Sequence, residues 1–146
     1  MIVVDTNLLA YFLLGGARTA SARDVFVRDP EWAAPMLWRS EFRNVLIQYV
    51  RQGLLDIEQA ILAYEKAQRV LAGREFLPAA AAVLRLAAAS GCTAYDSEFV
   101  AVAQQLQTIL VTSDKAILAA FPDVAIAPKE WIRKESDQPS AVSDQP

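Results

Sequence analysis

The sequence contains no histidine and only one cysteine, Cys92, among its 146 residues. Without histidine, the usual Ser-His-Asp and Cys-His nucleophile systems and histidine-ligated zinc are excluded. A single cysteine forms neither an internal disulfide nor a thiolate zinc site, so we expect a cytoplasmic protein in a reducing environment. The glycine-rich P-loop, the G-x-G-x-x-G loop and the G-x-S-x-G motif are also missing. Oxygen-ligand chemistry remains, and it suits Mg²⁺ or Mn²⁺.

Long hydrophobic segments are missing as well. No stretch offers about 18 uninterrupted apolar residues, so we expect no transmembrane helix and no membrane partner. The apolar start, residues 1–14, lacks a basic region and contains Asp5, which predicts a strand and a helix instead of a signal peptide. Residues 135–146 carry three acids, no base and little apolar surface. We therefore expect one domain over residues 1–134, followed by a disordered acidic tail.

The acidic balance does not exclude a nucleic-acid substrate. The net charge of −3 arises in the last twelve residues, because residues 1–134 contain 14 acids and 14 bases. If divalent cations neutralise several of these acids, the rest of the domain is mildly basic. The net charge alone therefore does not decide whether the partner carries phosphate groups.

Apolar, β-rich segments alternate with helical patterns along the domain. This alternation is typical of βαβ units, in which helices cover both faces of a parallel sheet. The sequence therefore predicts the α/β class. We expect strands at 1–4, 32–34, 74–77, 108–112 and 124–126, and helices at 6–14, 19–28, 37–52, 56–71, 78–90, 93–106 and 115–121.

Four acids stand at positions that would bring them to one edge of this sheet. Asp5 and Asp114 follow apolar strands, and open α/β sheets bind ligands beyond the carboxyl ends of their strands. Glu41 and Asp96 lie near the starts of helices that cover the same edge. Each acid alone is better explained as a helix N-cap or a first-turn acid, and only the four together favour a functional site. Glu98 lies two residues after Asp96, so the two do not face each other and its role is ambiguous.

A cluster of four carboxylates is unfavourable without cations, because each negative charge raises the pKa of its neighbours. Bound divalent metal removes this conflict and promotes hydrolysis of phosphate esters. A phosphatase or another carboxylate phosphotransfer protein is an alternative explanation of Asp5 at the end of a strand. Asn7 replaces the second acid that a haloacid-dehalogenase-type phosphatase requires, which weighs against that alternative.

Four short motifs follow one another in the first 130 residues: VVDTN at 3–7, SEFRNVL at 40–46, TAYDSEFVAVA at 93–103 and LVTSDK at 110–115. In this order they resemble the PIN-domain ribonucleases and, among these, the VapC-type toxins of bacterial toxin–antitoxin pairs. The resemblance covers nearly the whole chain except the tail. It implies a three-layer α/β/α PIN-like fold with a central parallel sheet of about five strands.

The resemblance also implies an activity, a cofactor and partners. We expect a Mg²⁺- or Mn²⁺-dependent endoribonuclease that forms a homodimer, cleaves RNA and is inhibited by a cognate antitoxin protein. The implied catalytic and metal-binding residues are Asp5, Glu41, Asp96 and Asp114, with Glu98 as a further candidate ligand, and Asn7, Thr112 and Ser113 would support them through hydrogen bonds.

Two arginines flank Glu41. Arg39 and Arg43 lie one turn apart and are candidates for contact with the RNA backbone or with antitoxin carboxylates, although ordinary solvation explains them equally well. A PIN-like interaction module without catalytic activity is a further alternative. The presence of all four acids argues against it, since loss of one acid would be the simplest route to inactivity.

Overall fold

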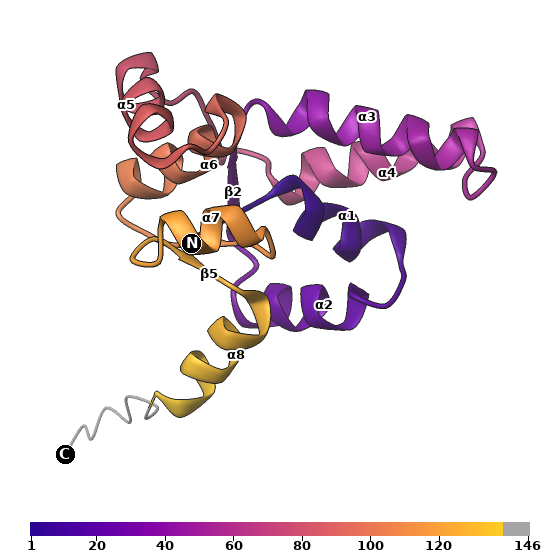
Figure 1. The fold of residues 1–146 in the computed structure, drawn as a ribbon. Coiled ribbons are helices and arrows are strands. Elements are labelled where there is room, and N and C mark those ends of the chain that lie inside the picture. The colour runs from indigo at the N-terminus through magenta and orange to yellow at the C-terminus, as the bar shows by residue number, and fades with distance from the viewer. Residues whose placement is uncertain (139–146) are drawn as a thin grey trace.

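The computed structural model describes residues 1–138, and its centre is a parallel sheet in the order β3-β2-β1-β4-β5 (Figure 1). β1 lies in the middle, with Val3 paired to Ala33 of β2 and to Leu110 of β4. The topological switch point therefore lies between β1 and β4, where open α/β sheets bind ligands. The strands are β1 (Ile2–Val4), β2 (Trp32–Pro35), β3 (Glu75–Phe76), β4 (Leu110–Val111) and β5 (Ala125–Ile126).

Eight helices surround the sheet within residues 1–138. Figure 1 shows two of them, α3 and α4, side by side as a hairpin that extends away from the sheet. None of the helices in this described part is long and apolar enough to cross a membrane. The helices are α1 (Thr6–Leu14), α2 (Thr19–Arg28), α3 (Trp38–Arg51), α4 (Ile57–Val70), α5 (Ala80–Ser90), α6 (Ala94–Gln105), α7 (Lys115–Ala120) and α8 (Pro128–Asp137).

The sheet separates two hydrophobic cores, because successive residues of a strand face opposite sides. Val4 and Trp32 pack on one face with residues of α1, α2, α3, α4 and α8. Val3 and Ala33 pack on the other face with residues of α6 and α7. The predicted three-layer α/β/α architecture with a parallel sheet of five strands is confirmed.

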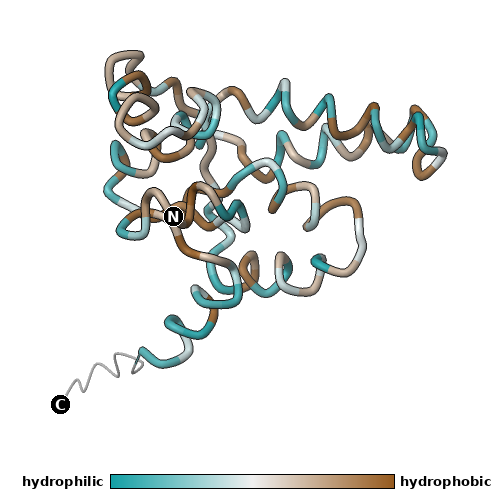
Figure 2. The backbone as a smooth tube through the Cα atoms, in the orientation of Figure 1, coloured by the Kyte–Doolittle hydropathy of each residue, from teal (hydrophilic) through white to brown (hydrophobic). Residues whose placement is uncertain are grey.

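Local sequence signals explain where several helices begin and end. The Asp56 side chain accepts a hydrogen bond from the Gln59 N–H, and the Gln59 side chain accepts one from the Asp56 N–H, which together form a capping box. α5 ends at Gly91, whose φ of 75° lies in the left-handed region that favours glycine. Figure 2 shows hydrophobic and hydrophilic residues alternating along α3 and α4, as in amphipathic helices.

Many predicted strand and helix ends are shifted by one or two residues, and one helix was not predicted. Helix α5 begins at Ala80 and not at Pro78, because the chain stays extended through Ala79 before α5 packs against α6. Helix α8 was not predicted, and it continues to Asp137, past the expected domain end at residue 134. It packs on α2 and buries Trp131, and Pro128 in its first turn is a helix-start signal that the prediction did not use. The rest of the predicted disordered tail, residues 139–146, lies outside the described residues.

Candidate active site

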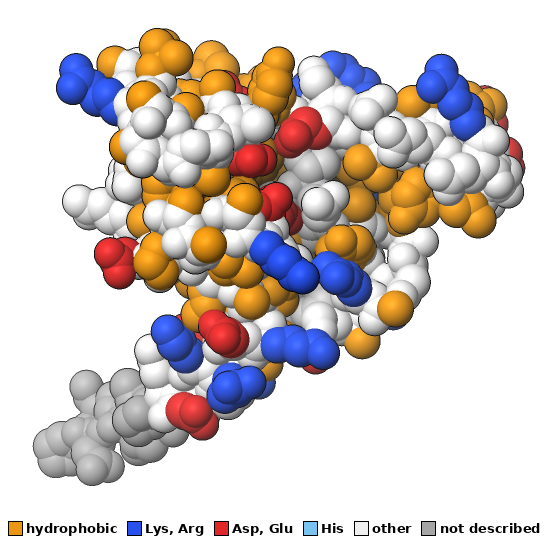
Figure 3. Space-filling model, viewed as in Figure 1, with side chains coloured by type: hydrophobic (Ala, Val, Ile, Leu, Met, Phe, Trp, Pro, Cys, Tyr) orange, Lys and Arg blue, Asp and Glu red, His pale blue; other side chains and the backbone are white. Residues whose placement is uncertain are grey.

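A cavity of about 210 Å³ lies at the switch point, and its walls contain all four predicted acids and no basic residue. We call it the acidic cavity. Asp5 follows β1, Glu41 lies in the first turn of α3, Asp96 in the first turn of α6, and Asp114 between β4 and α7. Figure 3 shows acidic side chains gathered in the centre of this face. Four elements that are distant in sequence therefore contribute carboxylates to one space.

Asp5 is held through both of its carboxylate oxygens. The side chain is the N-cap of α1, and its Oδ1 accepts a hydrogen bond from the Leu8 N–H at 2.8 Å. Its Oδ2 accepts a hydrogen bond from the Thr112 hydroxyl. Asp5 is only 7% exposed, so these contacts fix a nearly buried carboxylate. Each oxygen retains a lone pair that can bind a cation.

Thr112 connects the two acids that follow the central strands. While its buried hydroxyl donates to Asp5, the same oxygen accepts a hydrogen bond from the Asp114 N–H at 3.0 Å. Asp114 caps α7 through Oδ1, which accepts from the Ile117 N–H at 2.9 Å. One hydroxyl thus sets the position of both acids relative to each other.

The other two acids are positioned by threonines. The Thr6 hydroxyl donates to Glu41 Oε1 at 2.8 Å, which joins the start of α1 to α3. The Thr93 hydroxyl accepts a hydrogen bond from the Asp96 N–H at 3.0 Å and so caps α6. Asn44 lies one turn after Glu41 and lines the same cavity, as expected for two residues on one helix face.

Burial and like charge both oppose ionisation of Asp5 and Glu41. Burial is the main reason why the pKa of Asp5 is raised, and the carboxylates of Asp114 and Asp96 raise it further, against the hydrogen bonds from Thr112 and Leu8. Burial also raises the pKa of Glu41, again with a contribution from the neighbouring acids. The cavity therefore favours either protons or a bound cation.

The family model described as PIN domain matches residues 2–125, which contain all four acids. The chain belongs to the PIN domain family. PIN domains are generally nucleases, so the family indicates a hydrolase. No curated protein matches the sequence.

Two solved structures share the architecture of this PIN domain. PAE2754 from Pyrobaculum aerophilum is 24% identical with a TM-score of 0.73, and the alignment covers 94% of this chain and 97% of that chain. FitAcB from Neisseria gonorrhoeae is 18% identical with a TM-score of 0.70, covering 88% of this chain and 99% of that chain. At these identities the comparison concerns the fold alone.

The donors of this PIN domain fit a hard divalent cation, because carboxylate oxygens are the ligands that Mg²⁺ prefers. Within residues 1–138, no three acidic side chains are close enough together to form a complete metal cage. Mg²⁺ usually keeps several water ligands and needs only one or two carboxylates. The acidic cavity therefore fits a partly hydrated ion better than a fully enclosed one.

Of the remaining predicted ligand and supporting residues, one lines the acidic cavity and two do not. Asn7 is exposed and lines the acidic cavity. Glu98 is partly buried; it is not among the residues that line the cavity, although its charge contributes to the raised pKa of Glu41. Ser113 lines a neighbouring cavity.

The two arginines beside Glu41 do not line the acidic cavity. Arg39 donates to Glu75 from Nε at 2.6 Å and from Nη2 at 2.8 Å. The Arg43 guanidinium lies 5.8 Å from the centre of the Tyr64 ring, beside a groove between α3 and α4. Thr6 was missed as a partner of Glu41, because 35 residues separate the two and no local pattern predicts their contact.

Proposed function

We propose that this PIN domain is a Mg²⁺- or Mn²⁺-dependent endoribonuclease and the toxin of a VapC-type toxin–antitoxin pair. The main support is the convergence of four carboxylates, from four separate elements, on one cavity at the switch point. The order of the four sequence motifs supports the finer assignment to the VapC-type toxins. An RNA substrate would place its action in the cytoplasm.

In this proposal Asp5, Glu41, Asp96 and Asp114 surround a hydrated metal ion and bind it either directly or through its water ligands, with Glu98 nearby. Bound Mg²⁺ or Mn²⁺ would lower the pKa of water and offset the negative charge that develops on the phosphodiester during hydrolysis.

The chain's own residues orient the ligands. Thr112 favours the ionised form of Asp5 by donating to it, while Thr6 restrains Glu41 through Oε1 and leaves Oε2 available. Asn7 presents an exposed amide at the cavity, where it can donate a hydrogen bond to a phosphate oxygen or to water.

The direct test is cleavage of total bacterial RNA by the purified protein, with the new 5′ ends mapped. We expect discrete cuts in Mg²⁺ or Mn²⁺, and none when a chelator is present or when Asp96 is replaced by asparagine. Asp123→Asn is the matched control, because Asp123 is an exposed acid that does not line the cavity. Cuts that persist in chelator or in Asp96→Asn would contradict the metal assignment. Intact RNA, with protein free of antitoxin, would favour the non-catalytic interaction module.

We also propose that an amphipathic antitoxin helix binds between α3 and α4. A mainly apolar groove of about 340 Å³ lies there, and Ile61, which lines it, is 47% exposed. Amphipathic helices bind such grooves through their apolar face. Ile61→Glu should therefore abolish copurification with a coexpressed antitoxin. The neighbouring Leu62 is 48% exposed but does not line the groove, so Leu62→Glu should retain the antitoxin.

A homodimer is the third part of the proposal. Leu77 and Leu84, before and within α5, are 81% and 63% exposed, and Tyr95 at the start of α6 is 64% exposed. Exposed apolar surface often marks a protein interface, and these side chains lie within or next to α5 and α6, which pack against each other. Light scattering after gel filtration should give the mass of a dimer for the wild type and of a monomer for Leu84→Glu. A wild-type monomer at micromolar concentration would contradict the proposal.

A further inference from the structure

A second cavity, of about 400 Å³, adjoins the acidic cavity. Residues that are adjacent in sequence line different cavities. Asn7 lines the acidic cavity and Leu8 the second one, and Asp114 lines the acidic cavity while Ser113 and Lys115 line the second. The two spaces therefore meet along the start of α1 and the loop between β4 and α7. A chain molecule that passes over this loop can occupy both of them.

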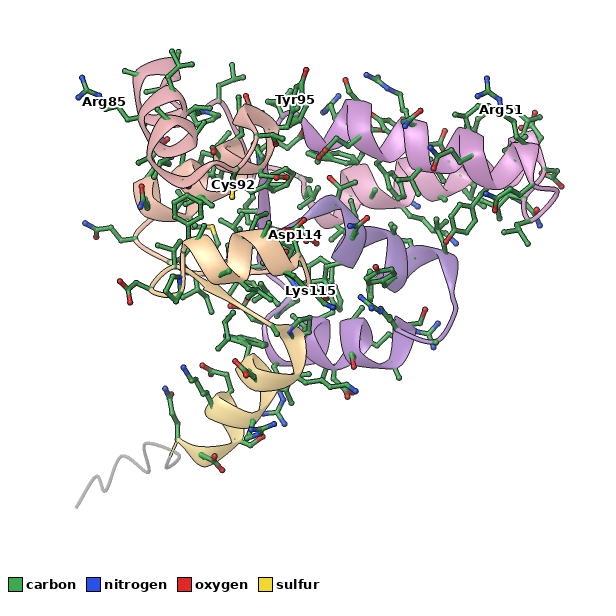
Figure 4. The ribbon with its side chains drawn as sticks, viewed as in Figure 1. Arg51, Arg85, Cys92, Tyr95, Asp114 and Lys115 are labelled. Carbon is green, nitrogen blue, oxygen red and sulfur yellow. The ribbon has the colours of Figure 1, made fainter. Side chains whose placement is uncertain are left out.

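The second cavity has the opposite charge, and we call it the basic cavity. Arg18, Lys115 and Lys129 line it, and no acid does. Within residues 1–138 none of these three side chains forms an ion pair. Figure 3 shows basic side chains directly beside the central acidic group, and Figure 4 shows Lys115 next to Asp114 at the start of α7. Three cationic groups thus line this cavity together with Tyr11, Ser21 and Ser113.

Arg18 is already held in place at this cavity. Its guanidinium lies 5.3 Å from the centre of the Tyr11 ring and donates to the Tyr11 hydroxyl at 3.4 Å. A cation restrained in this way loses less conformational entropy when it binds an anion. Lys115 and Lys129 are exposed and free to reach a ligand in the cavity.

Two of these cations lie at helix starts, and only one of the two first turns contains an acid, Glu130 of α8. Arg18 is the N-cap of α2, and Lys129 lies in the first turn of α8, so both stand at the positive ends of helix dipoles. Neither of these helix ends has a side-chain cap. A negatively charged group in the basic cavity would compensate for both features.

We propose that the basic cavity binds backbone phosphates of the RNA, next to the phosphodiester that lies in the acidic cavity. This inference rests on the proposed nuclease function. RNA carries one phosphate per nucleotide, so a strand whose scissile phosphate lies at the metal has further phosphates within reach of the adjoining cations. Arg39 is less suited to this contact, because its Nε and Nη2 already donate to Glu75.

The test measures RNA binding separately from cleavage. All proteins carry Asp96→Asn to prevent cleavage, and a fluorescent oligouridylate is titrated in Mg²⁺ at several salt concentrations. Adding Lys115→Ala and Lys129→Ala should weaken binding about tenfold and reduce the salt dependence of log K by about 1.4, since each phosphate contact to a single strand contributes about 0.7. Both lysines are exposed and lack ion pairs within residues 1–138, so these substitutions should leave the fold intact.

The control pair is Arg51→Ala with Arg85→Ala. It removes the same charge at two places far from the cavity, on α3 and on α5 (Figure 4). An unchanged affinity for this pair supports a specific phosphate site. Equal weakening by both pairs, no weakening by the lysine pair, or no binding at all would overturn the inference. It would also be wrong if the lysine pair lost binding only to an oligoglutamate peptide, because the cavity would then be a protein contact.

The same variants separate this inference from the proposed function. If the protein with Asp96 restored cleaves RNA in metal, but the lysine substitutions do not change RNA binding, only the phosphate site in the basic cavity is refuted. If the lysine substitutions weaken RNA binding, but the protein with Asp96 restored cleaves RNA in no divalent metal, only the nuclease function is refuted.

Discussion

Replacing Thr112 by valine should disconnect the two acids that follow the central strands. The Thr112 hydroxyl donates to Asp5 and accepts from the Asp114 N–H, and its side chain is fully buried. Valine has nearly the same shape as threonine but forms neither hydrogen bond. Thr112→Ser is the matched control, because serine keeps the hydroxyl and loses only a methyl group.

The two hydrogen bonds give the size of the effect. A hydrogen bond to a charged group contributes about 1.5–3 kcal/mol, and a buried N–H without a partner costs about 1–3 kcal/mol. Allowing for partial relaxation around Asp114, we expect Thr112→Val to lower the free energy of unfolding by about 2–4 kcal/mol. For a domain of this size, the loss corresponds to a decrease in Tm of about 6–12 °C.

The same substitution should weaken metal binding. The hydrogen bond from Thr112 lowers the pKa of Asp5 and so opposes the effect of burial. Without it the pKa of Asp5 rises further, and less of the ionised ligand is present at a given pH. Loss of a partner that orients a ligand typically weakens metal affinity or activity about 10- to 100-fold. The acidic limb of the pH–rate profile should also move to higher pH.

Two measurements test this reasoning. Scanning calorimetry gives Tm, and a Mg²⁺ titration of RNA cleavage gives the metal requirement of Thr112→Val, Thr112→Ser and the wild type. The reasoning is refuted if Thr112→Val keeps the wild-type metal requirement. It is equally refuted if Thr112→Ser loses as much as Thr112→Val, because the methyl group and not the hydroxyl would then be responsible.

Three further substitutions test other parts of the structure. Because the folded-state pKa values of Asp5 and Glu41 are raised, their contribution to folding is present below the unfolded values and is lost as pH rises through the folded values. Asp5→Asn should therefore raise Tm in chelator at neutral pH more than at acidic pH, and an equal change at both would contradict this. Arg39 lowers the pKa of Glu75, so that pair stabilises above the unfolded pKa and its effect is lost as pH falls. Glu75→Gln should destabilise by about 2 kcal/mol at neutral pH, as measured in urea, while RNA cleavage stays unchanged. Trp131 of α8 is 5% exposed, and Trp131→Ala should cost about 3–5 kcal/mol by the same measurement; a loss below about 1 kcal/mol would show that α8 is not part of the core.

The fold was predictable because its strands and most of its helices have strong local signals. Residues 2–4 and 110–111 are continuous apolar segments, which are typical of buried parallel strands, and an acid follows each of them within three residues. The capping box at Asp56 and the glycine at 91 mark helix ends directly. Helix α8 also has a start signal, because Pro128 lies in its first turn, and the prediction missed it.

The four acids of the site were predictable for a different reason. In parallel sheets the carboxyl ends of strands lie at one edge, so Asp5 and Asp114 were expected to approach each other before any contact was known. The partner of each side chain was not predictable, because it depends on tertiary distance. Neither the contact of Thr6 with Glu41 nor the pairing of Arg39 with Glu75 follows from sequence spacing.

The pairing of β1 with β4 at the centre of the sheet determines when the acidic cavity can form. Thr112 and Asp5 are 107 positions apart, and the sheet joins them only after β4 docks beside β1. During synthesis on the ribosome, Asp5 is made before β4 and has no partner acid until Asp114 follows. A polypeptide released before residue 112 lacks the Asp114 carboxylate and the hydroxyl that positions Asp5. The proposed ribonuclease would therefore be inactive towards the ribosome that translates it until β4 and Asp114 have been made.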